Sequence, residues 1–205
     1  MSKTATKATY HHGNLRQSLI KHASTMLKAD GIEALSMRKL ADAVGVSRTA
    51  LYHHFADKNA LLCALAEQGF VRWREEAEKV FAREDLSNHE KVRQFVRDYI
   101  HYAADNPQLY ELMFGRTIWK NATPTDELRA VAFPSFQHQV EMTRHWQSLG
   151  IMPKDEDTLR LAQVTWGTMH GIARLLIDGI YADRSHIDEM CDCAMHLFTA
   201  TSKSV

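Results

Sequence analysis

The sequence predicts an all-α fold, and three features of its 205 residues support this prediction. Apolar residues recur at helical spacing along almost the whole chain, whereas no stretch alternates apolar and polar residues as a half-buried strand does. Only four prolines and nine glycines interrupt these patterns, which favours long helices. A composition of 45% hydrophobic and 24% charged residues is typical of a globular protein that buries a core.

The first two predicted helices end at glycines. The apolar face of the first helix is Leu15, Leu19, Ala23, Met26 and Leu27. Asp30-Gly31 ends this helix, since glycine adopts the left-handed conformation past a helix terminus. Ser36 is the expected N-cap of the second helix, which ends at Gly45. The apolar face of the second helix is Met37, Leu40, Ala41 and Val44.

Two further helices are expected to begin at caps. Ser47 precedes a third helix, which runs to about His54, and Asp57 precedes a fourth, which runs towards Phe81. A capping box from Ser87 to Glu90 then opens a fifth helix.

The remaining elements lengthen towards the C-terminus. The fifth helix ends at about Asp105, and a short helix follows to Phe114. Residues 115–124 contain a glycine and a proline and are predicted to form a loop.

Three helices complete the prediction, over about Asp126 to Leu149, Asp155 to Tyr181 and Ser185 to Thr201. Pro134 is expected to kink or break the first of these, because proline removes a helical hydrogen bond.

The second and third helices form the most specific pattern. Ala41 is small where two short helices must cross, and Gly45 permits the positive φ of a tight turn. On the third helix Arg48, Thr49, Tyr52 and His53 fall on one face, which carries no large aliphatic residue. Such a face is suited to a helix that enters the major groove of DNA. The alternative is a helical hairpin within a bundle, with this polar face merely solvated.

Charge is distributed unevenly along a chain whose net charge is zero. Residues 1–62 hold nine Lys and Arg against four Asp and Glu, a net charge of +5, and the remainder carries −5. A basic N-terminal third favours binding to a polyanion such as nucleic acid, although chance clustering of solvated charges is the alternative.

The run from Leu35 to Leu62 resembles the DNA-binding domain of TetR-family transcriptional regulators, and the similarity extends over residues 14–65. The resemblance implies an all-α homodimer with two domains per chain, here residues 1–62 and 63–205. The first is a three-helix helix-turn-helix domain, and the second is a helical ligand-binding and dimerisation domain. Members are usually repressors that a small ligand releases from DNA.

The same resemblance implies roles for eight residues. Arg48, Thr49 and His53 are expected to face base edges or the nearby backbone, and Tyr52 and Lys58 are expected to contact phosphate. For Lys58, the N-terminus of the fourth helix adds a favourable electrostatic field.

Three other side chains and the N-terminal tail are weaker candidates. Ser36 and Ser47 act either as caps alone or also bond phosphate, and Arg38 either contacts phosphate or is solvated. A tail that resembles the start of some family members carries candidates for an arm along DNA: Lys3, Lys7, Tyr10 and His11.

The C-terminal part resembles one type of TetR C-terminal domain through Trp166-Gly-Thr-Met-His-Gly. Its long helix carries a heptad-like stripe of Leu159, Ala162, Trp166, Met169, Ala173, Leu176 and Ile180. A second patch on it is Leu161, Val164, Ile172 and Leu175, and the last helix has an apolar face of Ile187, Met190, Cys191, Ala194, Leu197 and Phe198. The resemblance implies that the last two long helices of each subunit form the dimer.

Large apolar side chains in this part predict a ligand pocket. The predicted ligand-binding residues are Tyr99, Tyr102, Phe114, Trp119, Trp146, Trp166, Met169 and His170. His170 is the candidate polar contact, and a buried histidine bonded to a backbone carbonyl is the alternative.

Other classes of function find little support. Cys191 and Cys193 lie on opposite sides of a predicted helix, which argues against a metal site with His186 and His196. The chain has no phosphate-binding glycine loop, nucleophile elbow or zinc-protease motif, so we expect no catalytic residues, cofactor or metal. The absence of a long apolar run argues against membrane insertion and, with an odd number of cysteines, favours a cytoplasmic protein.

The sequence therefore predicts a ligand-responsive transcriptional regulator, a repressor that binds a near-palindromic operator as a homodimer and is released by a small apolar molecule. A constitutive DNA-binding regulator without effector and a metal-responsive sensor are the alternatives, and activation rather than repression stays open.

Overall fold

The computed structural model describes residues 12–180 and 183–199, and helices are the only regular elements in this part of the chain. The elements are α1 (His12–Ala34), α2 (Met37–Val44), α3 (Arg48–Tyr52), α4 (Lys58–Phe81), α5 (Asn88–Asp105), α6 (Pro107–Phe114), α7 (Arg116–Trp119), α8 (Asp126–Ser148), α9 (Thr158–Asp178), the short 3₁₀ helix η1 (Arg184–His186) and α10 (Ile187–Thr199). The all-α prediction is confirmed.

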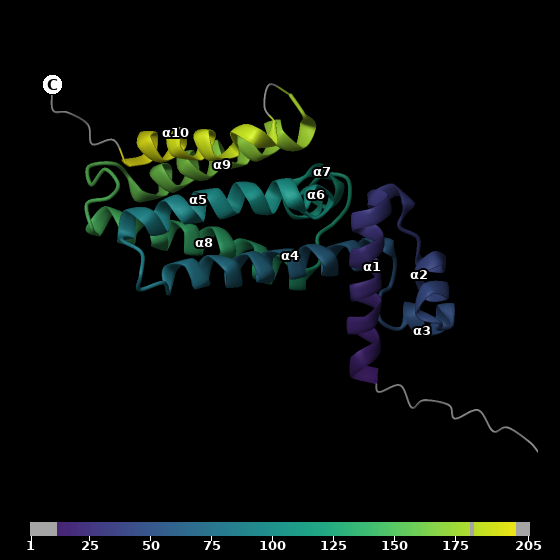
Figure 1. The fold of residues 1–205 in the computed structure, drawn as a ribbon. Helices are drawn as coiled ribbons and strands as arrows, with labels where there is room; N and C mark the ends of the chain where they lie inside the picture. Colours follow the sequence, from purple (N-terminus) through teal and green to yellow (C-terminus); the bar gives the residue numbers. More distant parts are fainter. Residues whose placement is uncertain (1–11, 181–182, 200–205) are drawn as a thin grey trace, which may run out of the picture.

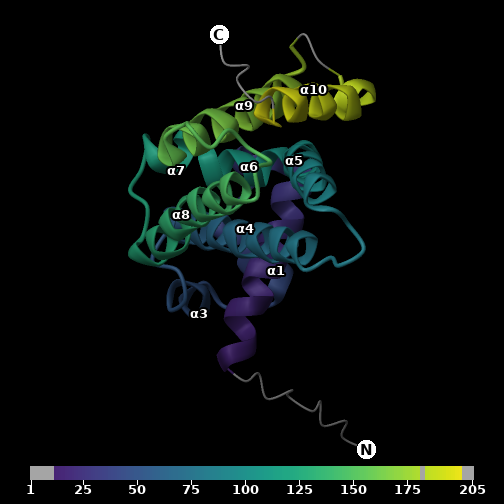
Figure 2. The same cartoon turned by 90° about the vertical axis from the view of Figure 1, so that its left-hand side faces the viewer.

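The long helix α4 connects the two ends of the molecule. The first three helices lie at its N-terminal end, while α5, α8, α9 and α10 are stacked alongside the rest of it (Figure 1). In the perpendicular view α9 and α10 form an outer pair, with α5, α6 and α8 between this pair and α4 (Figure 2). Any change in the position of α4 therefore affects both ends.

Most predicted helix boundaries are confirmed by cap geometry. The side chains of Ser36, Ser47 and Asp57 accept backbone hydrogen bonds at the starts of α2, α3 and α4. Ser87 and Glu90 form both hydrogen bonds of the predicted capping box at the start of α5. These ends are set by residues three positions apart, so local sequence determines them.

Several predicted boundaries need correction. The third helix ends at Tyr52 rather than His54, and α9 begins at Thr158 because Asp157, not Asp155, caps it. The last helix begins at Ile187, after the short turn η1. The predicted loop over residues 115–124 contains α7, a single turn whose Ile118 is fully buried.

Pro134 does not break α8, which runs continuously through it. The missing N–H of Pro134 leaves the carbonyl of Ala130 without its helical donor, and both residues are exposed, so water can pair with this carbonyl. The carbonyl of Val131 nearby accepts a hydrogen bond from the Ser135 hydroxyl at 2.8 Å.

Two clusters of buried apolar residues form the core. The first joins α1–α4 to α6, α7 and the start of α8, and the second joins α5, α9 and α10 to parts of α4, α6 and α8. Gly69 lets α6 approach α4 closely, because a Cβ at this position would lie 2.6 Å from Met113 Sδ. The predicted division at residue 62 falls inside α4, and it stays a prediction.

Candidate nucleic-acid interface and ligand cavity

The turn between α2 and α3 has the geometry that the sequence predicts. Gly45 has φ 75° and ψ 34°, and its N–H bonds back to the end of α2. Leu40, Ala41 and Leu51 are fully buried between the helices. The angle between α2 and α3 is therefore fixed by packing and by a glycine in the left-handed conformation.

The polar face of α3 is exposed as predicted. Arg48, Thr49, Tyr52 and His53 are all exposed, and Tyr52 retains 51% of its accessible surface. The opposite side of the helix is anchored by Leu51. A rigid short helix thus presents one hydroxyl, one phenol, one guanidinium and one imidazole to solvent.

The three weaker candidates lie beside this face. The Oγ atoms of Ser36 and Ser47 each accept a backbone N–H at 3.1 Å, from Lys39 and Ala50, so both serines are caps. Each hydroxyl keeps its proton for a further acceptor. Arg38 is exposed on α2. The predicted arm of Lys3, Lys7, Tyr10 and His11 lies outside the described residues.

Lys58 has a partner that the sequence does not reveal. Its Nζ donates to the carbonyl oxygen of Ile32 at 2.9 Å, which ties the start of α4 to the end of α1. Gly31, with φ 80°, turns the chain just before this carbonyl. The ammonium group keeps two further protons, so the bond to Ile32 is compatible with a phosphate contact.

A cavity of about 530 Å³ lies on the C-terminal side of the molecule. This volume is within the range of about 300–1,000 Å³ that small-molecule sites occupy. Its lining residues come from α4 to α9: Phe70, Trp73, Phe95, Tyr99, Met113, Phe114, Trp119, Ala132, Phe133, Ser135, Phe136, Gln139, Gln163, Trp166 and Gly167. Aromatic rings in mutual contact form much of the wall, for example Phe114 and Trp166 with centroids 5.8 Å apart.

The cavity brings together four of the eight predicted ligand-binding residues: Tyr99, Phe114, Trp119 and Trp166. The other four lie outside its lining. Trp146 packs on Phe81 and Phe95, and Met169 is buried in the second core cluster. The Tyr102 hydroxyl donates to the carbonyl of Gly69 at 3.0 Å, and burial raises the pKa of this phenol to about 12. A ligand contact by any of the eight stays a prediction.

His170 belongs to a hydrogen-bonded chain behind the cavity wall. Its Nδ1 lies 2.6 Å from the Tyr110 hydroxyl, which lies 2.7 Å from the hydroxyl of Tyr99. Burial, followed by the charge of Arg174, lowers the pKa of His170, so the neutral ring can accept from Tyr110. Its partner is thus a tyrosine rather than the backbone carbonyl that the sequence suggested as an alternative.

Sequence patterns missed several lining residues. Phe70 and Trp73 come from α4, whose residues are not among those predicted to bind a ligand, and Gln139 and Gln163 are polar residues that apolar periodicity does not select. Their one detectable signal is spacing, since Phe70 and Trp73 lie one turn apart on the same helix.

The outer pair of helices leaves an apolar strip exposed. Ala162, Met169 and Ala173 of the predicted stripe are buried inside the chain, whereas Leu159 and Ile180 are exposed. Val164 and Leu175 on α9 and Leu197 on α10 are also exposed, at 64%, 40% and 67%. Gly167 and Gly171 between them have open space where a Cβ would lie. We name Val164, Gly167, Gly171, Leu175 and Leu197 the outer strip.

The two cysteines of α10 point in different directions, as predicted. Cys191 is buried and its pKa is raised to about 11 by burial, whereas Cys193 is exposed. Across residues 12–180 and 183–199, no three His, Cys, Asp or Glu side chains are grouped in a way that could hold a metal ion. None of the helices in these ranges is long and apolar enough to cross a membrane.

Two family models match the chain. Residues 19–65 match the bacterial regulatory proteins of the tetR family, and residues 92–198 match the tetracyclin repressor-like C-terminal domain. The first match covers most of α1, all of α2 and α3 and the start of α4, and the second covers most of the part that encloses the cavity.

Curated relatives match about a quarter to a third of the chain. The chain is 48% identical over 52 residues to the tetracycline repressor protein class C of Escherichia coli, covering 25% of this chain and 24% of that protein. It is 39% identical over 62 residues to the HTH-type transcriptional repressor AcnR of Corynebacterium efficiens, covering 30% and 33%. The chain thus spans about a quarter to a third of the length of these relatives.

Solved structures match nearly the whole chain. A protein of unknown function from Rhodococcus sp. RHA1 is 31% identical, with a TM-score of 0.79 over 94% of this chain and 97% of that one. The TetR-family regulator PfmR of Thermus thermophilus shares the fold at 20% identity, with a TM-score of 0.64 over 91% and 99%. The solved structures confirm the fold, and the two family models confirm the predicted family. The chain belongs to the TetR family of DNA-binding transcriptional regulators, whose members are not enzymes.

Proposed function

We propose that this regulator binds a near-palindromic operator as a homodimer, and that a small apolar molecule in the cavity releases it from DNA. The observation that carries the proposal is the dual role of α4. Its first residue, Lys58, is bonded to the helix-turn-helix part, and its Phe70 and Trp73 form part of the cavity wall.

The exposed face of α3 supports sequence-specific binding. Thr49, through its methyl and hydroxyl groups, and Arg48, through its guanidinium, offer the contacts that read base edges in the major groove. Tyr52 and Lys58 are suited to phosphate, which positions the helix without reading sequence. Both curated relatives described above are named repressors, which favours repression here as well.

The outer strip supports a dimer. Exposed valine and leucine side chains flank two glycines whose missing side chains allow another helix to approach closely. A second copy packed on this strip would bury its apolar surface and place two copies of α3 on successive turns of DNA. Twofold symmetry of such a dimer is the reason to expect a near-palindromic site.

Contacts around Gly69 support coupling between cavity and DNA. Met113 of α6 packs against Gly69 of α4, and Tyr102 of α5 donates to its carbonyl. Met113 also lines the cavity, and α6 packs against α1. A ligand that displaces Met113 would therefore shift α4 and α6 relative to the helix-turn-helix part. Ligand and operator then oppose each other by favouring different conformations.

A constitutive DNA-binding regulator is the second candidate, and in that case the cavity would have no effector. The two candidates are separated by an experiment in three steps. Duplexes that bind the protein are selected from a random pool, ligands that raise the melting temperature are identified, and operator affinity is then measured with each ligand. Weaker operator binding supports release by ligand, whereas unchanged affinity with every ligand supports the constitutive candidate.

A further inference from the structure

The polar side chains of the cavity lie on one side of it. Ser135 and Gln139 come from α8 and Gln163 from α9, whereas the walls from α4 and α6 are formed by Phe70, Trp73, Met113 and Phe114. On the α5 and α7 walls, the Tyr99 hydroxyl is bonded to Tyr110 and the Trp119 indole N–H to the Met113 carbonyl. A ligand therefore meets an apolar surface from α4 and α6, whereas α8 and α9 present polar groups among apolar side chains such as Phe136 and Trp166.

Gln139 is the most informative of these residues. It is 92% buried, and the hydrogen bonds of the described residues include none to its side-chain amide; only its backbone carbonyl accepts, from Thr143. Gln147, two turns further along α8, is buried to nearly the same degree but fully bonded. Its amide donates to Pro153 and Glu156 and accepts from Thr158.

This contrast separates a structural glutamine from one that faces the cavity. A buried amide is normally paired, because an unpaired one loses its hydration without compensation. Gln147 follows this rule within the protein. Gln139 instead lines the cavity, and its amide atoms are not among the fully buried side-chain atoms without a partner. The amide is therefore open to the cavity, where water or a ligand can pair with its one acceptor and two donors.

The remaining polar groups restrict the occupant further. The Ser135 hydroxyl donates to Val131, so its oxygen remains as an acceptor, and the Gln163 carbonyl accepts from Arg160. Among the residues that the structure describes, no Asp, Glu, Lys, Arg or His lines the cavity. A charged ligand would thus lose its hydration without an opposite charge, whereas a plain hydrocarbon would leave Gln139 unpaired.

We infer that the cavity takes an uncharged ligand with a flat apolar body and a carboxamide or lactam group, which pairs with the side-chain amide of Gln139. The carboxamide donates to Oε1 of Gln139 and accepts from its Nε2. Gln139 then discriminates between ligands by their polar group, whereas the aromatic walls bind the flat apolar part of the ligand and do not distinguish one polar group from another. This inference rests on the proposed function, since it assigns the class of ligand to the same cavity.

The test compares three fused-ring probes of similar shape: naphthalene-2-carboxamide, 2-naphthoate and 2-ethylnaphthalene. Binding is followed without DNA through the fluorescence of Trp73, Trp119 and Trp166, which line the cavity. The wild type should bind the carboxamide about five- to tenfold more tightly than 2-ethylnaphthalene, a modest gain because the two hydrogen bonds to Gln139 replace bonds to water. The margin over 2-naphthoate should be larger, because the carboxylate loses its hydration without an opposite charge.

The key variant is Gln139→Leu, with Gln137→Leu as a matched control on an exposed position of the same helix. Gln139→Leu should abolish the preference for the carboxamide while 2-ethylnaphthalene binds as well as before, which also shows that the variant is folded. Its melting temperature should not fall, because the side-chain amide of Gln139 has no hydrogen bond to the described residues that the change could remove. Gln137→Leu should change neither the preference for the carboxamide nor the melting temperature.

Three results would overturn the inference. They are equal or tighter binding of 2-ethylnaphthalene by the wild type, tighter binding of 2-naphthoate, and a carboxamide preference that survives Gln139→Leu. Failure of all three probes to bind would overturn it too. Operator binding takes no part in this assay, so the first three results leave the proposed release from DNA by an apolar molecule intact.

Discussion

Replacing Lys58 with methionine separates two roles of this residue. Lys58→Met keeps the length of the side chain and removes the ammonium group that donates to Ile32 at 2.9 Å. If the ammonium also contacts a phosphate, each dimer loses two phosphate contacts. One contact contributes about 0.9 to the slope of log affinity against log salt, so the slope should become shallower by about 1.8. At 0.15 M salt this corresponds to roughly 30-fold weaker operator binding.

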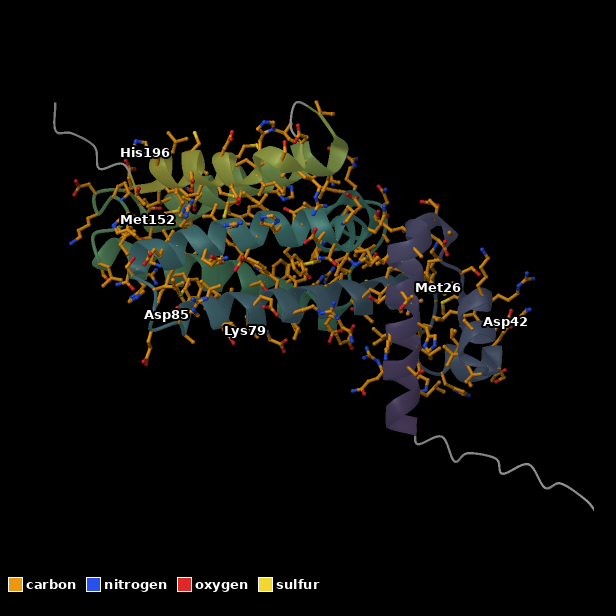
Figure 3. All side chains as sticks on the ribbon, viewed as in Figure 1. Met26, Asp42, Lys79, Asp85, Met152 and His196 are labelled. Carbon is orange, nitrogen blue, oxygen red and sulfur yellow. The ribbon has the colours of Figure 1, made fainter. Side chains whose placement is uncertain are left out.

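The same substitution also has a structural cost. A hydrogen bond from a charged donor contributes about 1.5–3 kcal/mol, and the lower end applies because Lys58 is only half-buried. We therefore expect the melting temperature to fall by about 3–6 °C. The matched control is Lys79→Met, whose lysine is exposed and pairs with Glu76 at 2.7 Å. Figure 3 shows Lys79 far along α4 from Met26 and Asp42 of the helix-turn-helix part.

Fluorescence anisotropy of operator and scrambled duplexes, titrated at four or more salt concentrations, measures both affinity and slope. The phosphate role predicts a shallower slope for Lys58→Met on both duplexes and no change for Lys79→Met. A lower affinity with an unchanged slope would refute the phosphate contact, and Lys58 would then act only by holding the carbonyl of Ile32.

Three further predictions test other parts of the molecule. Thr49→Ala should change base preference by about 1–3 kcal/mol at one position of each half-site without changing the salt slope, and equal loss on operator and scrambled duplexes would contradict this. Leu197→Glu should give a folded monomer near 23 kDa by light scattering, whereas Ala194→Glu should unfold the chain because Ala194 is buried inside it. A dimeric Leu197→Glu protein would exclude the outer strip as the interface. Tyr110→Phe should lower the free energy of unfolding by about 1–3 kcal/mol, measured by chemical denaturation, because it leaves the buried Tyr99 hydroxyl unpaired. Adding Tyr99→Phe should restore part of this loss, whereas additive losses would show that the two hydroxyls are not coupled.

The sequence predicts the helix boundaries and turns well wherever residues close together in the chain determine them. Ser36, Ser47 and Asp57 each cap the helix that begins at the next residue, by accepting a backbone N–H three residues downstream. Gly45 makes a turn that few other residues can adopt. The polar face of α3 is equally local, because its residues lie one turn apart. For the same reason, the family resemblance rests on a continuous run of residues.

The cavity depends on long-range packing, which the sequence does not specify directly. Trp146 and Trp166 have similar apolar character in the sequence, yet one is enclosed by Phe81 and Phe95 and the other lines the cavity. Gln139 and Gln147 are likewise indistinguishable until the positions of their neighbours are known. Periodicity identifies a buried face, but it does not show whether that face meets another helix or a void.

The central claim is that a ligand in the cavity and the operator oppose each other through α4. The most direct test is operator affinity with and without a ligand that raises the melting temperature, for the wild type and for Ala132→Phe, which places a larger side chain in the cavity wall. The account predicts that the ligand weakens operator binding by the wild type by about 5- to 150-fold, and that the operator weakens ligand binding by the same factor. The Ala132→Phe variant should bind the operator as the wild type does, but the ligand should no longer weaken this binding. Unchanged operator affinity with every stabilising ligand would contradict the account.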